Sequence, residues 1–296
     1  MTIFLKQLSR AIVHRLPETG SGRLIDQTLL ARWRFSNSTI TVACRPNLLM
    51  RVNPNDLVGR HLYFRGCFDP IVRDALIALA RPNDVFWDIG ANVAYMSCCI
   101  LKSVRDTNAV MVEPLPDVFE MAKENVERAG GSRAVSVRAA ISDRHGLTKM
   151  TRRPGNTGAS HILQPDEPVS IATDEVEMIT ARDLLARTPG NRVDLVKIDV
   201  EGHEAAVFRA FAELSAAEWP RSIVFEHHTK TGVVAPEIVG VLAARGYSIW
   251  RICKRLRGWV LVHHDAKSPK GFVDTADFIA VSKVEELDRL GVRRIG

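Results

Sequence analysis

The segment that most constrains the fold of this chain is residues 84–96, DVFWDIGANVAYM. Its apolar start is typical of a strand buried on both faces of a parallel sheet, and small and apolar residues predict a helix over 94–101. Between them, Asp88, Gly90 and Asn92 indicate a tight turn. Such a turn presents backbone N–H groups and a helix N-terminus at the carboxyl edge of the sheet, where α/β proteins bind ligands.

The negative charge of Asp88 at this turn bears on which ligand the turn can bind. A dinucleotide-binding fingerprint would place G-x-G-x-x-G here to hold a pyrophosphate, whereas the turn has Gly90 with Asp88 beside it. The next apolar segment, 108–112, is followed by a second acid, Glu113. An acid at that position can accept both ribose hydroxyls of an adenosine. The two acids fit S-adenosylmethionine (SAM), which carries a ribose, an ammonium and a sulfonium but no phosphate.

Five sequence blocks resemble, in the same order, those of the FkbM-type SAM-dependent methyltransferases. They are FWDIGANVAY (86–95), VEPLPDVF (112–119) with ENV (124–126), AAISD (139–143), LVKIDVEGHE (195–204) and IVFE (223–226). The resemblance extends over roughly residues 65–282. It implies an α/β fold of the Rossmann-like class I methyltransferases, a seven-stranded, mostly parallel sheet with helices on both faces. It also implies that the last strand inserts antiparallel.

The alternation of strand-like and helix-like segments from residue 84 predicts a parallel sheet with right-handed crossovers. Strands are expected near 84–88, 109–113, 134–139, 193–198, 222–226, 247–252 and 277–282. Helices are expected near 94–103, 116–129, 180–187, 203–213 and 235–245. An earlier helix should begin at Pro70 with Asp69 as its natural cap.

Two segments depart from this alternation. Residues 144–178 contain a long Gly/Asn/Ser-rich loop, which inside a compact domain is more often functional than idle, and we interpret it as part of an acceptor pocket or its lid. The basic run 251–257 is interpreted as a solvated loop edge, with contact to an anionic glycan or lipid headgroup as the alternative.

Residues 1–60 are expected to form a basic extension that precedes a methyltransferase domain over 61–296. The extension holds nine Lys and Arg against three Asp and Glu, whereas the remainder balances at 31 against 31. This balance argues against a nucleic-acid partner. A hairpin is expected over 39–52. Helices are expected over 3–16 and 23–34, the first with an apolar face formed by Phe4, Leu5, Leu8, Ile12 and Leu16.

We favour packing of the first helix on its own domain or on a second subunit, as in a homodimer, over docking on an anionic membrane surface. The composition, 46% hydrophobic and 25% charged, is that of an ordinary globular protein. Lys6 and Arg10 interrupt any signal-peptide pattern, and five cysteines without metal-ligand spacing are more typical of core residues than of disulfides. We therefore expect a reduced, cytoplasmic protein, membrane-peripheral only if the first helix docks on a bilayer.

For the cofactor, the resemblance implies binding by seven residues: Asp88, Gly90, Ala91, Asn92, Glu113, Ala140 and Asp199. Asp88 should accept a hydrogen bond from the SAM ammonium, directly or through water, and Gly90 should let the backbone approach the methionine part. Ala94 stands where the family usually has a second glycine. Its methyl group is expected to crowd the carboxylate end of SAM without abolishing binding.

The catalytic candidates lie after the fourth and fifth strands of the expected sheet. Methyl transfer is an in-line displacement in which positioning dominates. An alcohol acceptor must also lose a proton, and a general base accelerates that step by roughly 10²–10⁴-fold. The candidate catalytic residues are Asp199, His203, Glu226 and His227. A divalent cation held by Asp199, Glu226 and His227 has suitable ligand types, but a site without a cation is preferred.

The expected function is SAM-dependent O-methylation of a hydroxyl on a sugar, a glycan or a secondary metabolite. The acceptor class follows from the family resemblance, because no residue of the expected acceptor loop specifies a substrate. Two alternatives remain open at this point: a catalytically silent SAM-binding module, and a methyltransferase acting on protein or nucleic acid.

Overall fold

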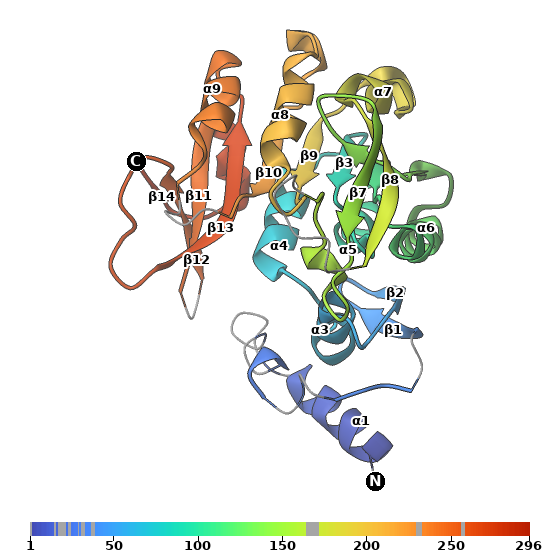
Figure 1. Ribbon diagram of the computed structural model, residues 1–296. Helices are drawn as coiled ribbons and strands as arrows, with labels where there is room; N and C mark the ends of the chain where they lie inside the picture. The colour runs from blue at the N-terminus through green and yellow to red at the C-terminus, as the bar shows by residue number, and fades with distance from the viewer. Residues whose placement is uncertain are drawn as a thin grey trace.

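The chain forms an α/β structure around one large sheet. The computed structural model describes residues 2–14, 16, 22, 25–28, 30, 33–36, 39–163, 172–228, 233–255 and 258–296. The sheet has nine strands in the order β14-β12-β11-β13-β10-β9-β3-β4-β5 (Figure 1). Their bounds are β3 Val85–Ile89, β4 Asn108–Val112, β5 Ala134–Val137, β9 Leu195–Ile198, β10 Ser222–Glu226, β11 Ser248–Lys254, β12 Trp259–His263, β13 Val273–Val281 and β14 Arg294–Ile295.

The strand order identifies the class of fold. β5, β4, β3, β9 and β10 are mutually parallel, and β13 inserts antiparallel between β10 and β11. Seven strands of this sheet, β3, β4, β5, β9, β10, β11 and β13, can be numbered 1 to 7 along the chain. From the β5 edge inward they lie in the order 3-2-1-4-5-7-6. This is the Rossmann-like arrangement expected for a class I methyltransferase. The expected strand count was wrong, because β12 and β14 extend the sheet beyond β11.

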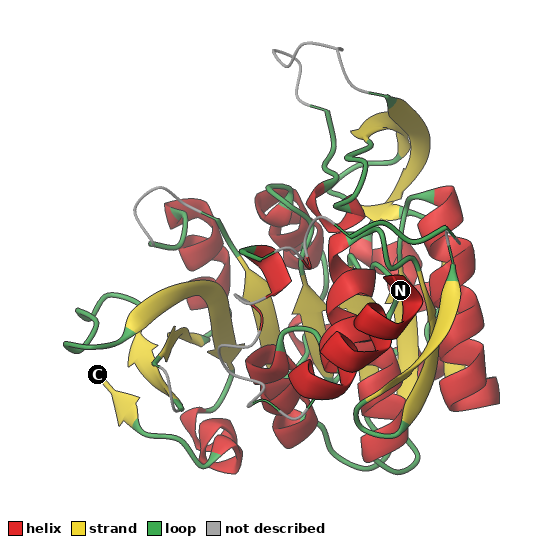
Figure 2. Ribbon diagram, turned by 90° about the horizontal axis from the view of Figure 1, so that it is seen from below, coloured by secondary structure: helices red, strands yellow, loops and turns green. Residues whose placement is uncertain are grey.

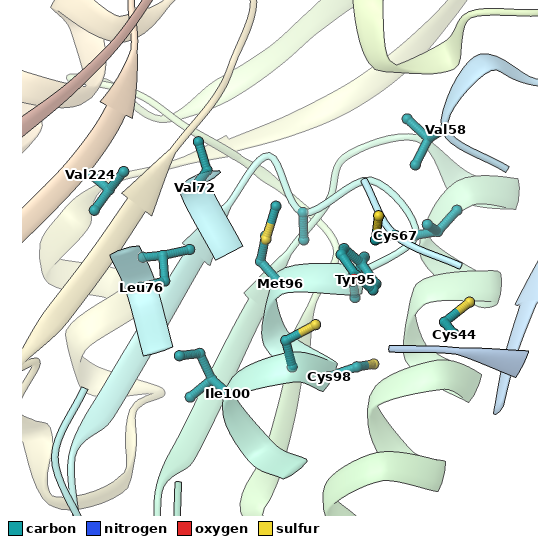
Figure 3. Packing of buried hydrophobic residues seen from close by; sticks show 14 of the residues in the cluster. Cys44, Val58, Cys67, Val72, Leu76, Tyr95, Met96, Cys98, Ile100 and Val224 are labelled. Atoms are coloured by element: carbon teal, nitrogen blue, oxygen red, sulfur yellow. The ribbon is translucent and has the colours of Figure 1, made fainter. Parts of the chain in front are cut away.

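Helices cover both faces of this sheet (Figure 2). One face packs in a hydrophobic cluster that contains Phe86, and the other in a cluster that contains Val85 and Trp87, as expected when alternate side chains of a buried strand point in opposite directions. Figure 3 shows part of the first cluster, where Leu76 and Ile100 come from two different helices. The helices are α4 Pro70–Leu79, α5 Tyr95–Ser103, α6 Pro116–Gly130, α7 Ala181–Ala186, α8 Glu204–Ala212 and α9 Pro236–Ala244.

The N-terminal segment packs on the first face of the sheet. Its hairpin pairs β1 (Ile40–Cys44) with β2 (Leu48–Val52), as expected, and precedes α3 (Leu57–Arg65). The hairpin is fixed to α6 because the backbone of Arg51 exchanges two hydrogen bonds with the Asn125 amide, at 2.7 and 2.9 Å. Residues of both segments therefore share one hydrophobic cluster.

The first helix, α1 (Thr2–Val13), forms where the periodicity predicts it and lies away from the β12–β14 end of the sheet (Figures 1 and 2). Among the described side chains of this helix, Val13 is buried, whereas Leu8 and Ile12 are 47% and 55% exposed. Leu8 and Ile12, two of the residues of the expected apolar face, therefore do not pack on the domain. The expected helix over 23–34 is only partly present: residues 25 and 26 are helical, 27 and 28 form a bend and 33 and 34 are irregular, while 23, 24, 29, 31 and 32 lie outside the described residues.

The basic run after residue 250 corrects another expectation. Residues 251–254 belong to β11 and are not a loop edge, while 256 and 257 lie outside the described residues. The Arg251 side chain is buried and donates to the carbonyl of Ala266 at 2.9 Å and to Ser268 Oγ at 3.0 Å. These internal acceptors let an arginine occupy a strand position.

Two further expectations concern redox state and membranes. All five cysteines are buried and free. Among the described residues, no helix is both long and apolar enough to cross a bilayer.

Candidate active site

A cavity of about 230 Å³ opens at the carboxyl ends of the central strands. Its walls come from the loops after β3, β4, β9 and β10, from the start of α4, and from a smaller sheet formed by β6 (Ala140–Ile141), β7 (Gly146–Thr151) and β8 (Thr173–Ile179). The predicted residues that line it are Gly90, Ala91, Asn92, Glu113, Ala140, Asp199, His203 and Glu226. Asp88 and His227 do not line it.

The loop after β3 adopts its conformation because of Gly90. This glycine has φ +75°, and a Cβ atom added to it would lie 1.8 Å from the carbonyl oxygen of Asp199. The backbone N–H groups of Gly90 and Ala91 both donate to Val112, at 3.1 and 3.0 Å. Glycine is therefore required by the close approach of this loop to the end of β9, a reason that the sequence alone did not indicate.

The position of Ala94 differs from the expectation that its methyl group crowds the carboxylate end of SAM. It occupies the left-handed region, with φ +61°, at the residue before α5. Its side chain is fully buried in the hydrophobic cluster below the loop and does not line the cavity. The methyl group therefore does not narrow the cavity, and its cost is backbone strain of roughly 1–2 kcal/mol for an L-residue in this conformation.

Glu113 follows β4 and connects two loops. Its Oε2 accepts from the Asn92 N–H at 2.9 Å, and its Oε1 accepts from the Leu115 N–H at 3.0 Å. Burial raises the pKa of Glu113 to about 7, although the two N–H donors act in the opposite direction. Each oxygen has a second lone pair, so the carboxylate can accept two hydroxyl groups from the cavity.

Asp88 lies beneath the cavity and is fully buried. Its Oδ2 accepts from the backbone N–H and the hydroxyl of Ser97, at 3.1 and 2.7 Å, and so fixes the first turn of α5. The Oδ1 atom has no hydrogen-bond partner among the described residues, and the nearest cation is Lys197 Nζ at 3.7 Å. The expected direct contact between Asp88 and a ligand ammonium does not fit this position.

The other end of the cavity is acidic. Ligand oxygens of Asp199, Glu201 and Glu226 lie within 4.8 Å of one another. Asp277 on β13 and Asp69 before α4 line the same region. Burial, followed by the carboxylates of Asp199 and Asp277, raises the pKa of Glu226 to about 10. At neutral pH the Glu226 carboxyl is therefore protonated and can donate a hydrogen bond.

Asp69 and Asp277 were not among the sequence candidates. Asp69 was expected to cap α4, but its side chain makes no capping hydrogen bond and it has φ +35°. Burial and neighbouring carboxylates raise its pKa to about 6, and burial raises that of Asp277 to the same value. Asp277 could have been noticed as a polar residue inside an apolar strand. Its position opposite Glu226, however, depends on how β10 and β13 are paired, which the sequence does not show.

The two histidine candidates occupy different surroundings. His203 lines the cavity, its Nε2 lies 3.1 Å from Ser142 Oγ, and burial lowers its pKa, which favours the neutral ring. His227 lies outside the cavity, because its Nδ1 contacts Glu204 at 3.2 Å and its Nε2 accepts from the Ala235 N–H at 3.3 Å. Both ring nitrogens of His227 are engaged. Hence His227 fits neither the expected role as base nor the alternative of a cation site with Asp199.

The long loop after β7, which was expected to form part of an acceptor pocket or its lid, lines the cavity and contacts the loop after β3. Thr157 donates its backbone N–H to Asp56 Oδ2 at 2.7 Å and accepts from Asn92 Nδ2 at 3.3 Å. Leu57 donates its N–H to Gly155 at 3.0 Å. The N-terminal segment therefore holds this loop over the site.

Comparisons with known proteins agree with this description. Residues 88–249 match the family model of the methyltransferase FkbM domain. The carboxyl-edge cavity and the strand order define a class I methyltransferase fold, and the chain belongs to the FkbM-domain methyltransferase family.

Two curated proteins are similar to the chain. The hexuronic acid methyltransferase AglP of Haloferax volcanii is 27% identical, and the match covers 57% of this chain and 65% of AglP. The chain thus spans less than two thirds of that relative. The 31-O-demethyl-FK506 methyltransferase FkbM of Streptomyces tacrolimicus is 26% identical, with 57% of this chain and 74% of that protein covered.

Among solved structures, an O-methyltransferase from Bacillus cereus is 15% identical, with 73% of this chain and 83% of that chain covered and a TM-score of 0.40. The fold assignment rests on the strand order, since that score is low.

Proposed function

We propose that this chain transfers the methyl group of SAM to a hydroxyl group of a sugar, a glycan or a secondary metabolite. The observation that carries the proposal is that Glu113, Asp199 and Glu226 line one and the same cavity. Membership of the FkbM-domain family supports the reaction. The named substrates of AglP and FkbM, a hexuronic acid and 31-O-demethyl-FK506, support the acceptor class.

The residues around the cavity fit SAM. Glu113 has free lone pairs for the two ribose hydroxyls, and Ala140 lines the wall beside it. The backbone of Gly90 to Asn92 forms the floor where the methionine part would lie. When bound, SAM supplies an electrophilic methyl group on a sulfonium. The acidic end of the cavity favours a ligand with that positive charge.

Asp199 is our proposed general base. Glu226 is protonated at neutral pH and can donate to the acceptor oxygen, so it is unsuited to remove the proton. The neutral ring of His203 already contacts Ser142. Asp199 lines the cavity at the end of β9, and its Oδ2 lies 3.1 Å from the Lys197 ammonium group. It can therefore accept the hydroxyl proton as the carbon–oxygen bond forms.

The acidic end of the cavity also favours a neutral acceptor over an anionic one. A carboxylate on the acceptor would lie beside Asp199, Glu201 and Asp277, and like charges at such distances repel strongly when partly shielded from water. We therefore propose a neutral sugar or polyol acceptor for this chain. This would differ from the hexuronic acid that gives AglP its name.

Calorimetric titration with S-adenosylhomocysteine (SAH), the product form of the cofactor, tests the first half of the proposal. The unmodified chain should bind SAH, and Glu113→Gln should weaken binding by roughly tenfold or more, since hydrogen bonds to charged groups contribute about 1.5–3 kcal/mol. The exposed Glu127→Gln on α6 is the matched control and should bind normally. Absence of binding by the unmodified chain would overturn the proposal.

Methyl transfer from radiolabelled SAM tests the second half. Methyl glucoside and methyl glucuronide, offered at equal concentration, compare a neutral with an anionic acceptor on the same ring. We expect labelling of the neutral sugar, loss of labelling with Asp199→Asn, and activity that survives EDTA. Preference for the glucuronide would contradict the proposed acceptor charge, and full activity of Asp199→Asn would contradict the proposed base.

A further inference from the structure

Lys197 places a buried ammonium group at the centre of the candidate site. It lies on β9, between β3 and β10, and is 8% exposed. Of the described residues that line the cavity, it is the only lysine or arginine. Its Nζ donates to the carbonyl of Gly90 at 2.9 Å, contacts Asp199 Oδ2 at 3.1 Å, and lies 3.7 Å from Asp88 Oδ1. The three N–H donors of an ammonium thus face three acceptors.

These three acceptors belong to different parts of the site. Gly90 is the first residue of the loop that would hold the cofactor, and Asp199 is the proposed base at the acceptor end. Asp88 fixes the first turn of α5 through Ser97. Lys197 therefore connects the cofactor loop, the acceptor end and the helix below them through one atom.

The charge of Lys197 is retained in spite of its burial. Burial alone would lower its pKa, but the carboxylates of Asp199 and Asp88 raise it by more, so the group stays an ammonium at neutral pH. A buried charge is costly unless it is paired, and removal of one partner leaves the other uncompensated. Replacement of Lys197 by an apolar residue would leave two carboxylates facing each other beside the Gly90 carbonyl.

We propose that Lys197 is a positioning residue, which fixes the cofactor loop and Asp199 relative to each other through its contacts with Gly90 and Asp199. Binding of the cofactor and placement of the base would then depend on the same ammonium group. The inference rests on the proposed function, because it assigns the loop to the cofactor and Asp199 to the acceptor. It adds a residue that was not among the sequence candidates.

The test compares Lys197→Met, which retains length and apolar stem, with Lys102→Met at an exposed position of α5. SAH affinity is measured by calorimetry on the folded protein, and the unfolding midpoint is measured in parallel. We expect Lys197→Met to bind SAH at least about tenfold more weakly. Lys102→Met should match the unmodified chain. A lower unfolding midpoint with unchanged SAH affinity would show a purely structural role and would overturn the inference.

Two further variants keep the test decisive. Lys197→Arg retains the charge, but its planar guanidinium cannot reproduce the three contacts, so it should fold and still bind SAH more weakly. The double variant Lys197→Met with Asp199→Asn also removes one of the two carboxylates that Lys197→Met leaves uncompensated. Its loss of SAH affinity should therefore be smaller than the losses of the two single variants multiplied together. A loss equal to that product would overturn the inference. Failure of the unmodified chain to bind SAH would overturn the proposed function and this inference together.

Discussion

Glu226 and Asp277 are directly opposite residues of the antiparallel strands β10 and β13. Directly paired residues of antiparallel strands project from the same face of a sheet, so both carboxyl groups reach the acidic end of the cavity. Two carboxyl groups held this close cannot both ionise without cost, and the pKa of Glu226 is raised to about 10 by burial and by the carboxylates of Asp199 and Asp277. The site therefore holds a proton at neutral pH.

This proton makes the stability of the ligand-free protein depend on pH. Between pH 4.5, the ordinary pKa of glutamic acid, and about 10, the folded chain binds a proton at Glu226 that the unfolded chain releases. Stability should therefore fall as the pH rises through this window. Glu226→Gln removes this dependence and should raise the unfolding midpoint more at pH 9 than at pH 6, while the control Glu127→Gln should raise it at neither pH. Parallel midpoint curves for Glu226→Gln and the unmodified chain between pH 6 and 9 would refute this assignment.

Gly90 should tolerate no side chain. In Gly90→Ala the new methyl group would lie 1.8 Å from the Asp199 carbonyl oxygen, so the loop or the end of β9 must move. Gly246→Ala is the matched control, because Gly246 has a similar φ of +76° and no atom within 4 Å of the added Cβ. We expect the control to lose roughly 1–2 kcal/mol in urea unfolding and Gly90→Ala to lose about 3 kcal/mol or more, with SAH binding abolished. Equal losses would show that the close approach to Asp199 is unimportant.

Ala94→Gly should be unusually well tolerated for a buried position. The replacement removes backbone strain of roughly 1–2 kcal/mol, which offsets the entropic cost of glycine and the loss of one buried methyl group. Ala122, which is equally buried in the middle of α6, has no such strain to lose. Urea unfolding should therefore show a change within about 1 kcal/mol for Ala94→Gly and a loss of roughly 2 kcal/mol for Ala122→Gly. A comparable loss in both would contradict the strain at Ala94.

The loop that covers the cofactor region should contribute to ligand affinity through Thr157. Thr157→Val removes the hydroxyl that accepts from Asn92 and leaves the backbone bond to Asp56 in place. We expect SAH affinity to fall by roughly threefold to tenfold, because one net hydrogen bond contributes about 0.5–1.5 kcal/mol. The unfolding midpoint should stay close to that of the unmodified chain. Thr148→Val on β7 is the control, and an affinity equal to that control would remove the loop from the binding site.

The fold was largely predictable because its strands are apolar runs bounded by turn residues. Residues 85–89 and 222–226 are strands within one residue of the expected bounds, since parallel strands buried on both faces leave a continuous apolar signal. β12 and β14 are additional to the seven strands that the family resemblance implied. The interpretation of 251–257 as a loop edge concealed the end of β11, because the internal hydrogen-bond acceptors of Arg251 lie 15 and 17 residues further along the chain and no local pattern indicates them.

The candidate site was predictable where a side chain acts next to its own motif. Glu113 and Asp199 line the cavity because each ends a parallel strand, and such ends meet at one edge of the sheet. Asp69 and Asp277 depend on how distant elements pack, so sequence spacing could not connect them. Asp88 differs from them, since it lies in the same motif as Gly90 but is fully buried and does not line the cavity.

The late insertion of β13 has a consequence for the synthesis of the protein. Proteins are made from the N-terminus, so β10 and β11 leave the ribosome before the strand that separates them in the finished sheet. Until residues 273–281 are available, β10 has an unpaired edge and Asp277 is absent from the cavity. A nascent or truncated chain that ends before this strand therefore has an open sheet edge and an incomplete acidic wall. Completion of the cavity is thus delayed until residues 273–281 have been made.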